Sequence, residues 1–116
     1  MKSPDLQRIE HIRDYCCVIQ KTLTRCGQAF QTFTADTDYE QSIAFSVFQI
    51  GELSGGLSEE FREKTSADIP WKMIRGMRNI IVHNYGNVDK EILWQVATED
   101  IPILLAFCEE ILRAQP

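Results

Sequence analysis

Apolar residues recur every three or four positions along most of the chain, and this spacing predicts helices. The first such stretch follows Ser3, a good helix cap, and Pro4, a residue favoured at the first helical position. It ends near Gly27, which is a helix terminator. The apolar positions of this first helix are Leu6, Ile9, Ile12, Cys16, Ile19 and Leu23.

The middle of the chain alternates between periodic and irregular stretches. Residues 28–36 show no clear period, so we expect a helix tail followed by a loop. Residues 37–40 have the form of a capping box, which predicts the start of a second, strongly apolar helix. The pair Gly55-Gly56 should end that helix, and Ser58 should cap a short helix that covers residues 59–64.

Two further helices are expected in the last third of the chain. The third covers about residues 71–83, and the fourth begins near Asp89. Pro102 should kink or restart the fourth helix, because proline lacks the backbone donor and clashes with the preceding turn. No stretch alternates as a strand would. We therefore predict an all-α fold, an antiparallel bundle of four main helices plus a short extra helix, as a single domain over residues 1–116.

Composition narrows the class of protein. The 116 residues are 44% hydrophobic and 25% charged, as in ordinary soluble domains. The net charge of −5 argues against a generic nucleic-acid binder. No secretion leader and no membrane-spanning run is visible, so we expect a cytoplasmic protein without a membrane partner. The four cysteines lack the spacing of a zinc site, so we expect reduced thiols and no metal.

The charge is distributed unevenly. Residues 69–88 contain no acidic side chain, whereas Lys72, Arg75 and Arg78 give this segment a charge of +3 and leave −8 for the rest. A local positive field of this kind suits a phosphate ligand. The chemistry of the chain is therefore expected on the third helix.

That helix carries the side chains that phosphate chemistry needs. Arg78 supplies a permanent cation, His83 the one group that titrates near neutrality, and Tyr85 a phenol. On a helical wheel Arg78, Asn79 and His83 share one broad polar face. Arg78 and His83 nevertheless lie about 140° apart on an ideal helix. One chain alone does not bring them together, whereas two facing copies would.

Other interpretations of these residues stay open at this stage. Trp71 and Val82 fall within the polar face, which predicts that this surface is covered, by a second copy or otherwise. Arg78 can instead pair with a carboxylate such as Glu52. His83 can serve only as a favourable helix-terminal residue, and Tyr85 only as a packing residue at the end of the bundle.

The segment from Ile69 to Tyr85 also carries a family likeness. With residues 49–52 before it and residues 88–102 after it, the segment resembles the HEPN superfamily. Within that superfamily it is most similar to the HepT-like toxins of the MntA–HepT type of toxin–antitoxin pair. The likeness covers most of the chain, and the sequence matches the family pattern at Arg78, His83 and Tyr85.

The resemblance implies a homodimeric, metal-independent endoribonuclease that uses no cofactor. Cleavage would use the ribose 2′-hydroxyl and leave a 2′,3′-cyclic phosphate and a 5′-hydroxyl. His83 would move protons, Arg78 would stabilise charge on the phosphate, and Asn79 would orient the phosphate or His83. From their charge, Lys72 and Arg75 are expected to help hold the RNA.

The resemblance also implies a partner, a nucleotidyltransferase antitoxin like MntA. Tyr85 matches the tyrosine that such an antitoxin adenylylates, and the added phosphate would place negative charge beside the catalytic groups. A second hypothesis is a non-catalytic module that binds a nucleotide or docks a minimal nucleotidyltransferase. A third is a purely structural helical adaptor. Cleavage of RNA by the unmodified protein separates the first hypothesis from the other two.

Overall fold

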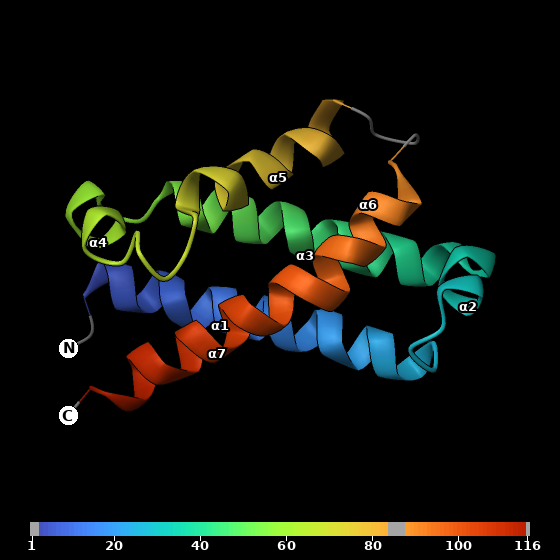
Figure 1. Cartoon of the computed structure of the whole chain (residues 1–116), viewed down its shortest axis with the longest axis horizontal. Coiled ribbons are helices and arrows are strands. Elements are labelled where there is room, and N and C mark those ends of the chain that lie inside the picture. The colour runs from blue at the N-terminus through green and yellow to red at the C-terminus, as the bar shows by residue number, and fades with distance from the viewer. Residues whose placement is uncertain (1–2, 84–87, 116) are drawn as a thin grey trace.

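The computed structural model describes residues 3–83 and 88–115, and it confirms the all-α fold. Within these ranges every regular element is helical. Figure 1 shows how the helices lie in space. In chain order they are α1 (Pro4–Arg25), α2 (Phe30–Ala35), α3 (Thr37–Gly55), α4 (Glu59–Lys64), α5 (Trp71–His83), α6 (Lys90–Gln95), the π-helical turn η1 (Val96–Asp100) and α7 (Ile101–Arg113).

The start of α1 follows its local sequence signals. The Ser3 side chain accepts a hydrogen bond of 3.2 Å from the backbone N–H of Leu6, and Pro4 occupies the first turn. Beyond the helix, Gly27 adopts φ 66°, a left-handed conformation that glycine reaches without strain. Apart from the partly buried Leu6, the predicted apolar stripe is buried, with Ile9, Ile12, Cys16 and Ile19 fully enclosed. Burial of this stripe fixes α1 in the core.

The long helices form one layer with α3 in its middle. Helix α3 packs against α1 on one side and against α5 on the other. The segment α6–η1–α7 crosses one face of this layer, where α7 packs on α1 and α6 on α3 (Figure 1). The opposite face of α3 is left uncovered, and Gln41, Phe45 and Glu52 are exposed there. We call this the open face.

Three aromatic rings join the start of α5 to α4 and α7. The Trp71 ring lies 6.2 Å from Phe61 and 5.7 Å from Phe107, and its indole N–H donates a 2.8 Å hydrogen bond to the Thr65 hydroxyl. Trp71 is therefore buried, which corrects the expectation that it belongs to the polar face. The side chain of the first helical residue points back over the preceding turn. A helical wheel does not represent the residues before the helix, so it cannot predict this contact.

The α-helix restarts at Pro102, which is one of the two expected outcomes: α7 begins at Ile101, and Pro102 lies in its first turn. The preceding residues form the wider turn η1, in which the N–H of Ile101 bonds to the carbonyl of Val96. A π-turn shifts the hydrogen-bond register by one residue. The chain can therefore continue into α7 although Pro102 has no donor to offer.

Two smaller expectations also need correction. The stretch expected as a helix tail and loop contains α2, whose Phe33 ring lies 5.1 Å from Trp94. The cap of α3 is Asp36, which accepts the N–H of Asp38 at 2.9 Å, so the predicted capping box is misplaced by one residue. Within the described ranges, no helix combines the length and the apolar character that crossing a membrane requires.

Candidate functional site

A glycine on α3 allows close packing of α5, the motif helix, which carries Arg78 and His83. A Cβ atom at Gly51 would lie 3.0 Å from the Cβ of Arg78 and 3.2 Å from its backbone nitrogen. Contacts this short are tighter than ordinary packing, so a larger residue here would require α5 to shift by a few tenths of an ångström. The close approach of α3 and α5 therefore fixes the backbone position of Arg78.

The side chain of Arg78 is held by two residues of α3. Its Nε atom forms an ion pair with a carboxylate oxygen of Glu52. Its guanidinium carbon lies 5.9 Å from the centre of the Phe48 ring, within the range of a cation–π contact. The ion pair that the sequence left open is thus present. The Arg78 side chain is still 43% exposed and can meet a ligand from the open face.

The other cations of the motif helix are also accessible. Lys72, Arg75 and Asn79 are all exposed. Arg75 lies over the last turn of α3, where its Nε atom would be 3.5 Å from a Cβ at Gly55. The wheel is confirmed for these polar positions and for the buried Ile74 and Met77, but it is wrong for Met73, which is 50% exposed.

The remaining motif residues are only partly covered by the structure. Helix α5 ends at His83, whose side chain lies outside the described part of the structure. Tyr85 falls outside the described residues altogether. The roles expected for these two residues stay predictions, as does the covering of Val82, whose side chain is also outside the described part.

Two of the four cysteines, Cys16 and Cys108, do not offer a reactive nucleophile. All four thiols are unpaired. Burial raises the pKa of Cys16, with Cys108 and Cys17 adding to the effect. Burial also raises the pKa of Cys108 to about 12, against the opposing charge of Arg13. Both thiols are therefore protonated at neutral pH and behave as small apolar core residues.

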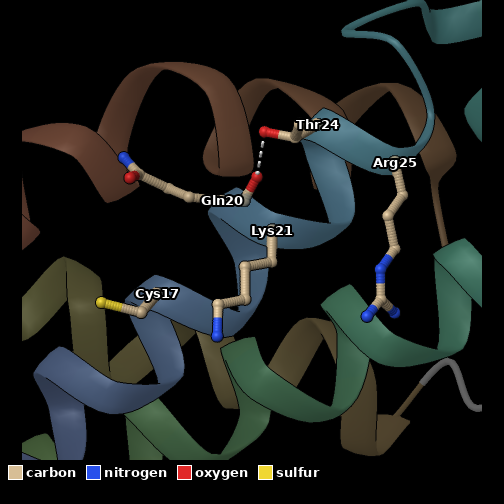
Figure 2. Close-up of a pocket in the computed structure, with 5 residues that line it drawn as sticks. All are labelled: Cys17, Gln20, Lys21, Thr24 and Arg25. Atoms are coloured by element: carbon tan, nitrogen blue, oxygen red, sulfur yellow. Dashed lines mark hydrogen bonds between the residues drawn. The ribbon is translucent and has the colours of Figure 1, made fainter.

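A separate hollow lies on α1, away from the motif helix. Figure 2 shows its lining, which comes from this helix alone: Cys17, Gln20, Lys21, Thr24 and Arg25. The Thr24 hydroxyl bonds to the Gln20 carbonyl at 3.1 Å, as is usual for threonine in a helix. Among the described residues, no three His, Cys, Asp or Glu side chains are grouped closely enough to hold a metal ion.

Sequence reasoning missed two contributors to the site, Phe48 beneath Arg78 and Arg8 at the end of α3. A Cβ at Gly56 would lie 2.7 Å from the Nε atom of Arg8, so this α1 residue reaches the end of α3. The glycines of α3 were the available signal. They recur where a neighbouring helix or side chain approaches, but one sequence does not say which neighbour.

The fold and site define a small helical protein with a partly exposed arginine, anchored by a carboxylate, in a cationic surround. Comparison with known proteins gives the family. A model of the family described as "Ribonuclease HepT-like" matches residues 6–111. The chain belongs to this HepT-like ribonuclease family, within the HEPN type that its motif resembles.

Individual relatives agree with this assignment. A protein of Caldanaerobacter subterraneus subsp. tengcongensis, named as an RNase, is 35% identical over 115 residues, which cover 99% of both chains. One of Methanocaldococcus jannaschii, also named as an RNase, is 38% identical over 79 residues, covering 60% of this chain and 72% of its own. One of Thermococcus cleftensis, named as a ribonuclease HepT, is 30% identical over 82 residues, covering 71% and 74%. No solved structure matches the chain significantly.

Proposed function

We propose that this protein is an endoribonuclease that cleaves RNA without a metal ion. The ribose 2′-hydroxyl attacks the adjacent phosphate, and the products carry a 2′,3′-cyclic phosphate and a 5′-hydroxyl. The observation that carries the proposal is the placement of Arg78, which is held by Glu52 and stays accessible in a segment without acidic residues of its own. Membership of the ribonuclease family supports it.

Arg78 is suited to stabilise the charge that builds on the phosphate oxygens. Its contact with Glu52 runs through Nε, so the terminal nitrogens of the guanidinium can still meet a phosphate. The Phe48 ring limits the motion of the planar group from below. A donor held in place in this way needs no reorganisation when the transition state forms.

His83 is the proposed acid–base group. It takes the proton of the 2′-hydroxyl or returns one to the leaving 5′-oxygen, and a group that titrates near neutrality can do either. Asn79, exposed one residue beyond Arg78, orients the phosphate or His83. Lys72 and Arg75 hold the RNA by charge alone.

The decisive experiment is cleavage of a structured RNA by the purified, unmodified protein in excess chelator. We expect cleavage that leaves 5′-hydroxyl ends. His83→Ala and Arg78→Ala should each lose at least about a hundredfold in rate, because general acid–base and charge stabilisation typically contribute that much. Equal cleavage by the wild type and both variants would place the activity elsewhere, and loss of cleavage in chelator would refute metal independence.

We further propose that the enzyme acts as a homodimer. On the open face, Phe45 is 57% and Val18 41% exposed, and the Tyr15 ring lies 6.1 Å from Phe45. These three residues form an apolar patch over α1 and the middle of α3. A second copy that covers the patch would bring Arg78 of one chain towards His83 of the other, which one helix cannot do by itself.

The partner proposed for this enzyme is a nucleotidyltransferase antitoxin of the MntA type. Adenylylation of Tyr85 would add a phosphate two residues beyond His83 in the sequence. That phosphate would compete with RNA for the guanidinium and repel the RNA backbone. Mass spectrometry of the protein, expressed with and without a nucleotidyltransferase of the MntA type, tests for this modification at Tyr85.

One observation favours the second candidate function, a module that binds a nucleotide or the nucleotidyltransferase without cleaving RNA. Arg78 is already neutralised by Glu52, and the chain as a whole carries −5. A pure binding module needs only an accessible arginine. The cleavage assay separates the two, since this candidate leaves RNA intact while it binds nucleotide saturably.

A further inference from the structure

The last turn of α3 carries two adjacent glycines, and an arginine from a neighbouring helix lies over each. A Cβ at Gly55 would be 3.5 Å from the Nε atom of Arg75, and a Cβ at Gly56 would be 2.7 Å from that of Arg8. Arg75 belongs to α5 and Arg8 to α1, so the two guanidiniums approach the same turn from opposite sides. Both glycines are exposed, which leaves the surface between the arginines accessible.

No carboxylate in the described part of the chain neutralises either guanidinium. Over residues 3–83 and 88–115, neither Arg8 nor Arg75 forms an ion pair or a side-chain hydrogen bond. The nearby carboxylate of Asp5 is engaged elsewhere, since it accepts the N–H and the hydroxyl of Ser58 at 2.8 and 2.6 Å. The negative end of the α3 dipole favours cations here, yet the donors of both guanidiniums remain unused.

The two arginines continue the surface on which Arg78 lies. Arg75 precedes Arg78 by one turn of α5, and Gly55 follows the Arg78 contact at Gly51 by one turn of α3. Because adjacent Cα atoms are 3.80 Å apart, the Nε atoms of Arg8 and Arg75 lie within about 13 Å of each other. A polyanion bound at Arg78 can therefore extend over the end of α3 towards α1.

We propose that Arg8 and Arg75 form a two-sided clamp that binds a backbone phosphate of the RNA next to the one that is cleaved. The identity of the polyanion rests on the proposed ribonuclease function. The clamp makes Arg8, a residue of α1 far from the motif in sequence, part of the substrate-binding surface. It also defines the path of the RNA strand, which runs from the reacting phosphate over Gly55 and Gly56. The contact is to phosphate only, so it carries no base preference.

The first test removes the Arg8 contact and measures the salt dependence of binding. The probe is a single-stranded RNA with 2′-O-methyl riboses, which lack the nucleophile and stay intact. Each phosphate contact to a single strand contributes about −0.7 to the slope of log K against log salt. Arg8→Gln should reduce the slope by about that amount, which corresponds to affinity about fourfold weaker at 0.15 M salt and about eightfold weaker at 0.05 M.

The matched control is Arg25→Gln, which removes the same charge from the same helix. Arg25 is exposed and lies about 25 Å further along α1 at the helical rise per residue. It should leave the salt slope at the wild-type value. An unchanged slope in Arg8→Gln, or an equal change in both variants, would overturn the clamp.

A second pair of variants moves Arg8 without removing its charge. Alanine at Gly56 would collide with the Arg8 guanidinium, and its backbone fits, because φ there is −87°. Gly56→Ala should therefore weaken binding, but by less than Arg8→Gln does, because the displaced side chain keeps its charge. Alanine at Gly55 makes only ordinary contact with Arg75, so Gly55→Ala should bind like the wild type. Wild-type binding by Gly56→Ala would contradict the proposal.

The outcomes for the clamp and for the enzyme are separable. Wild-type protein that binds the probe with an Arg8-dependent slope, but leaves unmodified RNA intact, refutes the ribonuclease and supports the clamp. Wild-type protein that cleaves RNA, with the same slope in Arg8→Gln, refutes the clamp alone. Failure of the wild type to bind the probe at low salt refutes the clamp, and cleavage of unmodified RNA then decides the ribonuclease by itself.

Discussion

Arg78 contacts two residues of α3, the carboxylate of Glu52 and the ring of Phe48, and the carboxylate affects a bound phosphate in two ways. The exposed pair with Glu52 contributes at most about 1 kcal/mol to stability. Its larger effect is to hold a long, flexible side chain in one place beside a phosphate. The same carboxylate repels that phosphate, so Glu52 should weaken binding of RNA and favour the chemical step.

Because Glu52 both positions Arg78 and repels the phosphate, we predict that its removal lowers both KM and kcat. Glu52→Gln should lower KM, because a negative charge leaves the site. It should also lower kcat by on the order of tenfold to a hundredfold, because a misplaced catalytic group costs about that much. Steady-state cleavage of a short RNA measures both. Glu109→Gln, an exposed change on α7, removes the same charge and should alter neither. A KM that rises in Glu52→Gln would show that the carboxylate aids binding instead.

At the scale of helices, the glycine at the α3–α5 contact couples packing to the site. Replacing glycine by alanine inside a helix normally stabilises by up to about 1 kcal/mol. Gly76→Ala on α5 should do so, because nothing lies within 4 Å of the added Cβ. Gly51→Ala should gain less, since its Cβ meets the backbone of α5, and Gly51→Val should lose about 1–3 kcal/mol through overpacking.

Denaturant unfolding at one protein concentration measures these differences. The comparison among the three variants matters more than any single value, because Gly76→Ala reports only the difference in helix propensity between glycine and alanine. If Gly51→Ala were stabilised as much as Gly76→Ala, the close approach of α3 to Arg78 would be wrong. In that case the position of the guanidinium would not depend on this glycine.

The same scale shows what one sequence can predict. Ser3 and Ser58 cap their helices as expected, because capping is decided by residues three positions apart. The short α2 was missed, because its Phe30 and Phe33 are held by Trp94 from a distant helix rather than by a local period. The turn before Pro102 was missed for a related reason, since proline predicts a disturbance but not how the chain absorbs it.

The residues of the site also divide into those that the sequence predicts and those that only the structure reveals. The polar face of α5 follows from helical geometry, and the exposure of Arg75 and Asn79 agrees with it. Arg8 could not be assigned from the sequence, because only the tertiary packing of α1 on α3 brings it over Gly56. Residues that act through contacts between helices need the structure, whereas residues that share one helix face do not.

The whole molecule has two unlike faces. One face of the α1–α3–α5 layer is covered by α6, η1 and α7, and the open face carries both the apolar patch at Phe45 and the arginines. The patch lies over α1 and the middle of α3, whereas Arg75 and Arg78 belong to α5, so a second copy that covers the patch can leave the arginines at the end of α3 accessible to RNA. Phe45→Glu should therefore give a monomer that does not cleave. Ile103→Glu, at a 61% exposed position on the covering helix α7, should stay dimeric and active.

Mixing two inactive variants tests whether the site is shared between chains. In a dimer of Arg78→Ala with His83→Ala, one shared site lacks both groups and the other has both. Random exchange of subunits should therefore restore about a quarter of wild-type cleavage, since half of the dimers are mixed and each has one intact site of two. If each site belonged to a single chain, the mixture would stay inactive. The result thus decides between a composite site and a dimer that only places two complete sites side by side.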